Sequence, residues 1–260
     1  MGKYFEINNL VLDFKTIDGD FRALNIDHLD IDNGESFGIV GESGAGKTVL
    51  ALTILGLLPP TAVRIRSGEI LLEGTDLLKL GKKELMNIRG KKIAMIFQDP
   101  MSSLNPVFTI GRQMEDVIRC HRKISRANAR AEAIKAIETV RLPDAESCLG
   151  KYPHQLSGGQ RQRIVIALAL SCKADFLIAD EPTRNLDVTI QAGILKLIDE
   201  LRKELGITVL YISNNFSLAS VVCSRIAVLR KGSIVECGAR EEIIGHPQDE
   251  YTKLLLKVGE

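Results

Sequence analysis

The chain has 260 residues, enough to bury a large core in one domain or in two closely packed parts. Its formal net charge of +1 gives no bulk attraction for a polyanion, so nucleic acid is not expected as a partner. No apolar run approaches the ~20 residues of a membrane-spanning helix, and the first residues are not typical of a targeting segment. The five cysteines are scattered without a Cys-x-x-Cys pair, which indicates reduced and mostly buried thiols.

Two alternating runs open the chain. Residues 4–14 and 22–31 alternate between apolar and polar side chains, which predicts antiparallel strands joined by a turn at residues 18–20. Phe14, or a neighbouring residue, stands where an aromatic ring could stack on an adenine. A core or edge-strand position explains an aromatic residue there at least as well, so the sequence leaves both interpretations open.

The next stretch reads GESGAGKT and fits the phosphate-binding pattern Gly-x-x-x-x-Gly-Lys-Ser/Thr without a mismatch. The strand-like residues 37–40 precede it, and the helical residues 49–58, stopped by two prolines, follow it. Glycines let the backbone wrap a phosphate closely, and the helix N-terminus adds positive potential. Lys47 is expected on the β- and γ-phosphates and the Thr48 hydroxyl on Mg²⁺. The predicted nucleotide-binding residues are Gly41, Glu42, Ser43, Gly44, Ala45, Gly46, Lys47, Thr48 and Val49.

The middle of the chain changes character. Residues 68–74 and 92–97 are strand-like, and the polar residues 77–89 between them predict a helix. Residues 101–150 begin with turn chemistry and continue as a helical pattern rich in Arg and Lys. We interpret this stretch as a helical insertion whose charges form solvated helix faces.

Strands and helices alternate through the second half. A helix is expected to begin near Ser157 and to continue through the apolar residues 164–170, and a second helix is expected over residues 189–205, closed by Gly206. Buried strands are predicted at residues 176–180 and 207–212, and a hairpin at 225–230 and 233–237. The alternation predicts an α/β fold with a parallel sheet covered by helices on both faces, whose nucleotide site lies at the strands' carboxyl ends.

The strand at residues 176–180 ends in two carboxylates, Asp180 and Glu181. Asp180 is expected to hold Mg²⁺, usually through water, and Glu181 to polarise the water that attacks the nucleotide. A helix cap or an ion pair would explain either carboxylate alone. The strand context and the phosphate loop upstream favour the functional interpretation.

The stretch from Leu156 to Gln160 matches the signature sequence of ATP-binding cassette proteins and stands between the phosphate loop and the carboxylate strand, in the expected order. From about residue 4 to about residue 256 the chain resembles the ATP-binding subunits of ABC transporters, most of all those of oligopeptide and dipeptide importers and their nickel or metallophore relatives. The stretches that carry the likeness are residues 39–44, 96–106, 152–157 and 178–183. The resemblance implies a P-loop cassette with a mostly parallel sheet core, an antiparallel β subdomain and a helical subdomain.

This resemblance assigns roles to parts of the chain. Residues 1–98 and 151–260 become the antiparallel β and RecA-like core, and residues 99–150 the helical subdomain that grips the membrane subunits. Gln98 becomes the glutamine that senses Mg²⁺ and the attacking water, and Phe14 takes the adenine-stacking position. The residues implied to contact the γ-phosphate of ATP held by a partner subunit are Ser157, Gly158, Gly159 and Gln160.

The same resemblance implies cofactors, partners and location. ATP and Mg²⁺ are the expected cofactors. A second ATPase subunit, two membrane permease subunits and an extracytoplasmic substrate-binding protein are the expected partners, and the chain is expected to sit peripherally on the cytoplasmic face of the inner membrane.

Two departures from the family pattern affect the chemistry. Asn214 stands in place of the switch histidine, and the histidines at positions 28, 121, 154 and 246 cannot fill that place in any register. Asparagine can donate an amide hydrogen bond to a phosphate but cannot become cationic or relay a proton. Arg184 and Asn185 replace the usual small residues of the loop that crosses the dimer interface. We therefore predict slow hydrolysis at this chain's own site and pairing with an unlike ATPase whose site this chain completes.

Three alternatives stand beside peptide import. Nickel-type relatives tend to vary over residues 97–106 and to carry methionine after the signature glycines, where this chain has Gln160, so nickel or metallophore import is less favoured. A nucleotide-binding regulatory half of an asymmetric pair agrees with Asn214 but not with the intact Glu181. A soluble cassette of DNA repair or translation would need long insertions or tandem cassettes.

Overall fold

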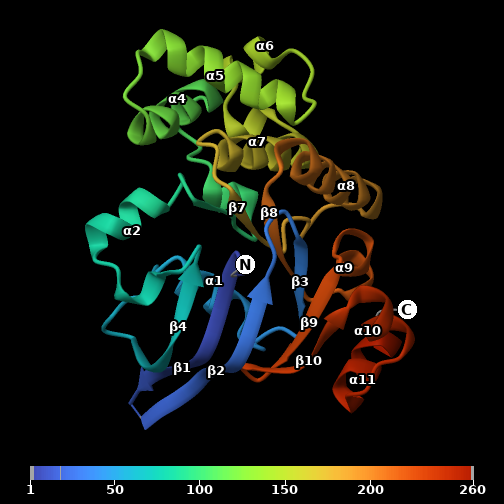
Figure 1. Ribbon diagram of the computed structural model, residues 1–260. Helices are drawn as coiled ribbons and strands as arrows, with labels where there is room; N and C mark the ends of the chain where they lie inside the picture. The colour runs from blue at the N-terminus through green and yellow to red at the C-terminus, as the bar shows by residue number, and fades with distance from the viewer. Residues whose placement is uncertain (1–2, 18, 259–260) are drawn as a thin grey trace. The chain divides into compact units, whose positions relative to one another are not determined.

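The computed structural model describes residues 3–17 and 19–258 and divides into two compact units (Figure 1). The first unit runs to Met86 and resumes at Thr208, and the second comprises Asn87–Ile207. The boundaries predicted for the helical subdomain, residues 99–150, stay a prediction.

An antiparallel sheet with the strand order β2-β1-β4-β5 lies in the first unit. Its strands are β1 (Phe5–Thr16), β2 (Gly19–Ile31), β4 (Val63–Leu72) and β5 (Thr75–Asp76). The inward positions of β1 and β2 are apolar and buried, as the period of two requires, so the two antiparallel strands are confirmed. The turn expected at residues 18–20 is wrong in its extent, because Gly19 and Asp20 belong to β2 and pair with Thr16 and Lys15. Asp18, within the predicted turn, lies outside the described residues. β4 begins before the strand expected over residues 68–74, and Gly74, with φ +78°, belongs to the turn that follows.

A second group of strands in this unit carries the phosphate loop. β3 (Ser36–Val40) lies between β8 (Thr208–Ser213) and β9 (Arg225–Arg230) and is parallel to both, while β10 (Ser233–Ala239) is antiparallel to β9. All residues of β3 and β8 are buried. Strands buried on both faces carry apolar residues at most positions, which explains the nearly continuous apolar runs of the sequence. Ser36, Thr208 and Ser213 are the buried polar exceptions.

Two helix predictions in this part of the chain are wrong in their extent. α1 (Lys47–Ile54) begins before residue 49 and ends well before residue 58, because Gly56 has a left-handed φ of +59° that interrupts the helix. The helix expected over residues 77–89 is split into η1 (Leu77–Lys79) and α2 (Lys82–Ile88), because Leu80 between them is extended. The remaining helices of the first unit are α9 (Phe216–Val222), α10 (Arg240–Gly245) and α11 (Glu250–Val258).

The second unit combines two parallel strands with a set of helices. β6 (Ile93–Ile96) pairs in parallel with β7 (Phe176–Asp180). The helices are α3 (Pro100–Ser103), α4 (Ile110–His121), α5 (Arg126–Thr139), α6 (Ala145–Gly150), η2 (Pro153–Gln155), α7 (Gly158–Leu170) and α8 (Val188–Leu205). α4, α5 and α6 pack on one another (Figure 1). α7 contacts both α5 and β6. Gly206 closes α8 in the left-handed conformation, as predicted.

The hydropathy of the described helices and the state of the cysteines bear on two expectations from the composition. Within residues 3–17 and 19–258, none of the helices combines the length and hydropathy that crossing a bilayer requires. The cysteines are free thiols; Cys148, Cys172 and Cys223 are buried, whereas Cys120 and Cys237 are exposed.

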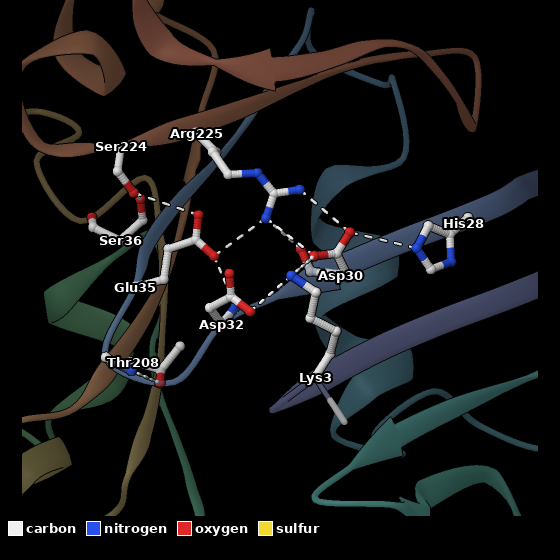
Figure 2. Close-up of polar contacts among 10 residues, drawn as sticks. Lys3, His28, Asp30, Asp32, Glu35, Ser36, Thr208, Ser224 and Arg225 are labelled. Atoms are coloured by element: carbon white, nitrogen blue, oxygen red, sulfur yellow. Dashed lines mark hydrogen bonds and ion pairs between the residues drawn. The ribbon is translucent and has the colours of Figure 1, made fainter. Parts of the chain in front are cut away.

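An ion-pair cluster links the two sheets of the first unit (Figure 2). Arg225 on β9 donates through Nη1 to Asp30 Oδ2 on β2 at 3.2 Å and to Glu35 Oε2 at 3.4 Å. Lys3 Nζ lies 3.0 Å from Asp30 Oδ2, and His28 Nε2 lies 3.4 Å from Asp30 Oδ1. Burial pushes the pKa of Asp30 upward, but the hydrogen bonds from Arg225 and Lys3 outweigh it and hold that pKa below its ordinary value. The cluster therefore stabilises the fold when Asp30 is ionised.

Replacing Arg225 with methionine is expected to lower the free energy of unfolding at pH 7 by about 1–3 kcal/mol, because Asp30 and Glu35 then lose a half-buried cation. The folded-state pKa of Asp30 is depressed, so the ion pair contributes above the ordinary aspartate pKa of about 4 and is lost as the pH falls through the lower folded value. Urea unfolding at pH 7 and at about pH 3 measures both effects.

A matched control is Lys79→Met, which removes a far more exposed cation from Asp76. We expect that variant to lose little stability at either pH. Equal losses for Arg225→Met at both pH values would contradict the ionic origin of the effect.

Candidate functional site

The phosphate loop follows β3 and is shaped by contacts that require glycine. A Cβ atom added to Gly41 would lie 2.2 Å from the carbonyl oxygen of Leu229 on β9, so only glycine fits there. Gly44 and Gly46 have φ angles of +83° and +107°, a region that side chains disfavour. The backbone N–H of Glu42 donates to the Tyr251 hydroxyl at 3.1 Å, which ties the loop to α11. The loop is therefore held in one conformation from several sides.

Lys47 begins α1 and turns its side chain back into the loop. The ammonium nitrogen donates to the carbonyl oxygens of Gly41 at 2.8 Å and Glu42 at 2.9 Å, and the residue is only 4% exposed. These carbonyls offer dipoles and no formal charge, so an anionic phosphate would be a stronger partner for the ammonium. A bent glycine backbone around a buried ammonium, at the start of a helix, fits a phosphate group. Thr48, the next residue, is exposed.

The other predicted members of the loop are also accounted for. Glu42, Ser43 and Gly44 are exposed, whereas Ala45 is buried and Val49 is half-buried on the first turn of α1. The exposed stretch is the part of the loop that a ligand can reach directly.

Asn214 lies at the same end of the sheet as the loop. Val40, the last residue of β3, pairs with Ser213, the last residue of β8, and Asn214 follows directly. The Ser213 hydroxyl accepts a hydrogen bond from the Asn215 backbone N–H at 3.0 Å, and Asn215 caps α9 by accepting from the Leu218 N–H at 3.2 Å. Asn214 itself is exposed between these two fixed neighbours. Asn214 is therefore exposed at the edge of the sheet where the phosphate loop begins.

Phe14 is accompanied by a second aromatic residue. Phe14 pairs directly with Phe21 across the hairpin, and Leu12 pairs with Leu24. Directly paired residues point to the same face, and so do Leu12 and Phe14 along one strand. On that face the Leu24 side chain lies 3.1 Å from the position of a Cβ on Gly46. The two rings therefore belong to the face of the hairpin that meets the phosphate loop.

Phe21 is 64% exposed and was missed by the sequence reasoning. The signal that could have revealed it is the register of the predicted hairpin, since residues at equal distance from the turn face each other. Phe21 lies in the exposed first part of β2, directly opposite Phe14, so its ring is open to a ligand.

The second group of predicted residues lies in the other unit. β6 and β7 are parallel with Ile96 opposite Ala179, so the residues that follow both strands emerge at one edge. Asp180 ends β7 and is 2% exposed. Gln98 and Glu181 meet there, with Gln98 Nε2 donating to Glu181 Oε2 at 2.7 Å. The structure thus brings together an amide and a carboxylate that the sequence separates by 83 positions.

The signature residues form the N-terminus of α7. Ser157 is the N-cap: its hydroxyl oxygen accepts from the Gln160 backbone N–H at 3.3 Å, and the Gln160 side-chain oxygen accepts from the Ser157 N–H at 3.0 Å. Ser157 is exposed, and Gly158, Gly159 and Gln160 are half-buried. The Ser157 hydroxyl can still donate a hydrogen bond, because accepting one does not use its hydrogen. This helix start is available to a ligand from outside the chain.

Comparison with known proteins agrees with this chemistry. Residues 24–184 match the model of the ABC transporter family. The chain is 45% identical over 256 residues to the dipeptide transport ATP-binding protein DppD of Bacillus subtilis (strain 168), covering 98% of this chain and 76% of the relative. It is 44% identical over 254 residues to the oligopeptide transport ATP-binding protein OppD of the same strain, covering 98% of this chain and 71% of that relative.

A solved structure gives the same result. A dimeric ATP-binding cassette in a post-hydrolysis state, bound to ADP and Pi, superposes with a TM-score of 0.79 at 28% identity, over 91% of this chain and 98% of that chain. The chain therefore belongs to the ABC transporter family, in which it is an ATP-binding domain of the ATPase type with the ABC cassette fold. The predicted α/β class and the predicted resemblance are both confirmed.

Proposed function

We propose that this chain is the ATP-hydrolysing subunit of an importer, and that it couples ATP binding and hydrolysis to the uptake of oligopeptides or dipeptides through membrane permease subunits. The names and the 45% and 44% identities of the peptide-transport relatives support the substrate class. The observation that carries the hydrolytic role is the Gln98–Glu181 hydrogen bond, because it holds the Glu181 carboxylate beside the Gln98 amide at the end of β7, next to the buried Asp180. A carboxylate in that position is suited to polarise an attacking water.

The roles of the remaining residues follow from their chemistry. Lys47 would bind the β- and γ-phosphates of ATP, and residues 41–49 would wrap them with backbone N–H groups. The Thr48 hydroxyl, the Asp180 carboxylate and the Gln98 amide oxygen would hold Mg²⁺, which prefers hard oxygen ligands. Mg²⁺, when bound, neutralises charge on the phosphates.

The adenine would stack on Phe14, and Phe21 would extend the aromatic surface. Stacking on an aromatic ring is worth about 1–3 kcal/mol per base. The shared face of these two rings with Leu24 supports the assignment, because Leu24 packs beside Gly46 of the phosphate loop.

Asn214 is proposed to weaken this chain's own site. An amide can donate to a phosphate, but it can neither carry the positive charge of an imidazolium nor relay a proton. Its exposed position at the end of β8, opposite the end of β3, supports a place beside the γ-phosphate.

Asn214→His is expected to raise kcat for ATP hydrolysis about tenfold or more, because a positioned donor or proton relay contributes at least that much. Phosphate release by the purified chain measures the effect. Asn214→Gln is the matched control, since it keeps an amide and should gain nothing. Equal turnover of the unchanged chain and Asn214→His would contradict a weakened site.

The partners are proposed from the exposed signature helix. Ser157, Gly158, Gly159 and Gln160 would complete an ATP site on a second, unlike ATPase subunit. Two permease subunits, contacted through residues 99–150, and an extracytoplasmic substrate-binding protein would complete the importer. The chain would then lie on the cytoplasmic face of the inner membrane as a peripheral subunit.

Uptake measurements in the cells that carry this gene test which class of molecule is imported. Deletion of the gene is expected to abolish uptake of a labelled dipeptide or oligopeptide and to leave Ni²⁺ uptake unchanged. Restoration by the intact gene, but not by Lys47→Ala, would tie the loss to this site. Loss of Ni²⁺ uptake with intact peptide uptake would instead favour the nickel or metallophore alternative.

A second candidate function is a nucleotide-binding regulatory half of an asymmetric pair. Asn214 favours it, because a site without the switch histidine can bind ATP and hydrolyse little. Normal peptide uptake with a Glu181→Gln chain, together with lost uptake for Lys47→Ala, would support this candidate over the hydrolytic one.

A further inference from the structure

One oxygen of the Glu181 carboxylate receives two side-chain donors. Gln98 Nε2 lies 2.7 Å from Glu181 Oε2, and Arg184 Nη1 lies 3.2 Å from the same atom. The Glu181 side chain is 10% exposed, whereas that of Arg184 is 48% exposed. The Arg184 donor is therefore a half-exposed cation, and the carboxylate that it contacts is nearly buried.

The backbone presents Arg184 to this carboxylate. Glu181 has a left-handed φ of +44°, and the Arg184 N–H donates to the Glu181 carbonyl at 3.0 Å, so the chain turns back on itself. Gln191 on α8 fixes the turn by donating to the carbonyl oxygens of Thr183 at 3.1 Å and Leu186 at 3.0 Å. The turn thus brings the Arg184 guanidinium back to the Glu181 carboxylate, and Gln191 holds the turn from α8.

The two donors limit what Glu181 can do. A carboxylate oxygen has two lone-pair sites, and on Oε2 the amide and the guanidinium occupy both. A water molecule can then engage only Oε1. The proposed role of Gln98 toward Mg²⁺ uses its amide oxygen, so its Nε2 can stay on Glu181 beside Arg184.

We propose that Arg184 is a positioning residue that restrains the Glu181 carboxylate and thereby slows ATP hydrolysis at this chain's own site. The restraint rests on the proposed role of Glu181 as the group that polarises the attacking water. Arg184 acts through Glu181 and does not itself contact the nucleotide. Since a half-exposed ion pair is weak, the restraint is modest, and its removal is expected to change the rate about two- to fivefold.

The test measures kcat and KM for ATP in the full chain carrying Asn214→His, which supplies the higher signal. Adding Arg184→Ala is expected to raise kcat about two- to fivefold with KM changed less than about twofold, because binding contacts are untouched. Adding Arg184→Lys, which keeps the charge, is expected to stay close to the parent rate. Arg112→Ala is the matched control, since it removes an arginine of similar exposure that pairs with Asp116.

The outcomes distinguish a failure of the proposed restraint by Arg184 from a failure of the proposed ATP hydrolysis through Glu181. A kcat for Arg184→Ala that is unchanged or lower, or an equal rise for Arg112→Ala, overturns the restraint. Glu181→Gln in the same background tests the hydrolytic role by itself. If this variant loses turnover while Arg184→Ala has no effect, only the proposed restraint fails. If Glu181→Gln keeps full turnover, or the background itself does not hydrolyse ATP, the proposed function fails and the restraint with it.

Discussion

Lys47→Ala is expected to weaken ATP binding about tenfold or more and to lower ATP hydrolysis by about 10²–10³-fold, the usual cost of removing a preorganised charge from a reacting phosphate. The reason is the environment of the ammonium. It is 4% exposed, and the carbonyl oxygens of Gly41 and Glu42 hold it inside the loop, so alanine removes the positive charge that the loop encloses. Titration with a fluorescent ATP analogue and a phosphate-release assay measure the two effects.

Lys79→Ala is a suitable control, because that lysine is 78% exposed, pairs with Asp76 and lies outside the phosphate loop. It should bind and hydrolyse ATP like the unchanged chain. Full ATP affinity in folded Lys47→Ala protein would contradict the assignment of the loop as the phosphate site.

Ser157→Arg is expected to leave ATP binding by the same chain within about twofold and to lower turnover about 100-fold. The reason is that the signature helix is proposed to act on the ATP of another subunit, where a bulky cation would block its approach. Ser157 is exposed and its hydroxyl lies at the helix start, so the change is made on the surface. Loss of the N-cap alone costs about 0.5–2 kcal/mol of stability.

Ser125→Arg is the matched control for the cap. Ser125 caps α5 in the same way, accepting from the Asn128 N–H at 3.2 Å, but it lies outside the signature. Similar loss of stability without loss of turnover is expected there. Equal loss of turnover in both variants would mean that Ser157 acts only as a helix cap.

The parts of the fold that the sequence predicted are those with one-sided or continuous apolar patterns. Residues 4–14 and 22–31 alternate because one face of their sheet is buried, and 207–212 are apolar except for the buried Thr208 because β8 is buried on both faces. The positions at which helices end were harder to predict. Gly56 and Leu80 interrupt patterns that continue in the sequence, because a single backbone conformation ends a helix regardless of the side chains beyond it.

The candidate site was predictable in its chemistry but not in its contacts. Lys47, Asp180 and Glu181 could be named because their motifs are local. Phe21 and the Arg184–Glu181 ion pair depend on register and on a turn, which single residues do not reveal. The hydrogen bond from the Glu42 N–H to the Tyr251 hydroxyl spans 209 positions, and no local pattern contains it.

The central claim is that one chain holds ATP on its phosphate loop and that the signature helix of another chain completes the site. A mixture of two inactive full-length variants, Lys47→Ala and Ser157→Arg, both carrying Asn214→His, tests it by phosphate release. Mixed pairs contain one intact Lys47 opposite one intact Ser157, so about a quarter of the Asn214→His rate is expected to return. A mixture as inactive as its separate components, or a Ser157→Arg chain that retains the full rate alone, would contradict the claim.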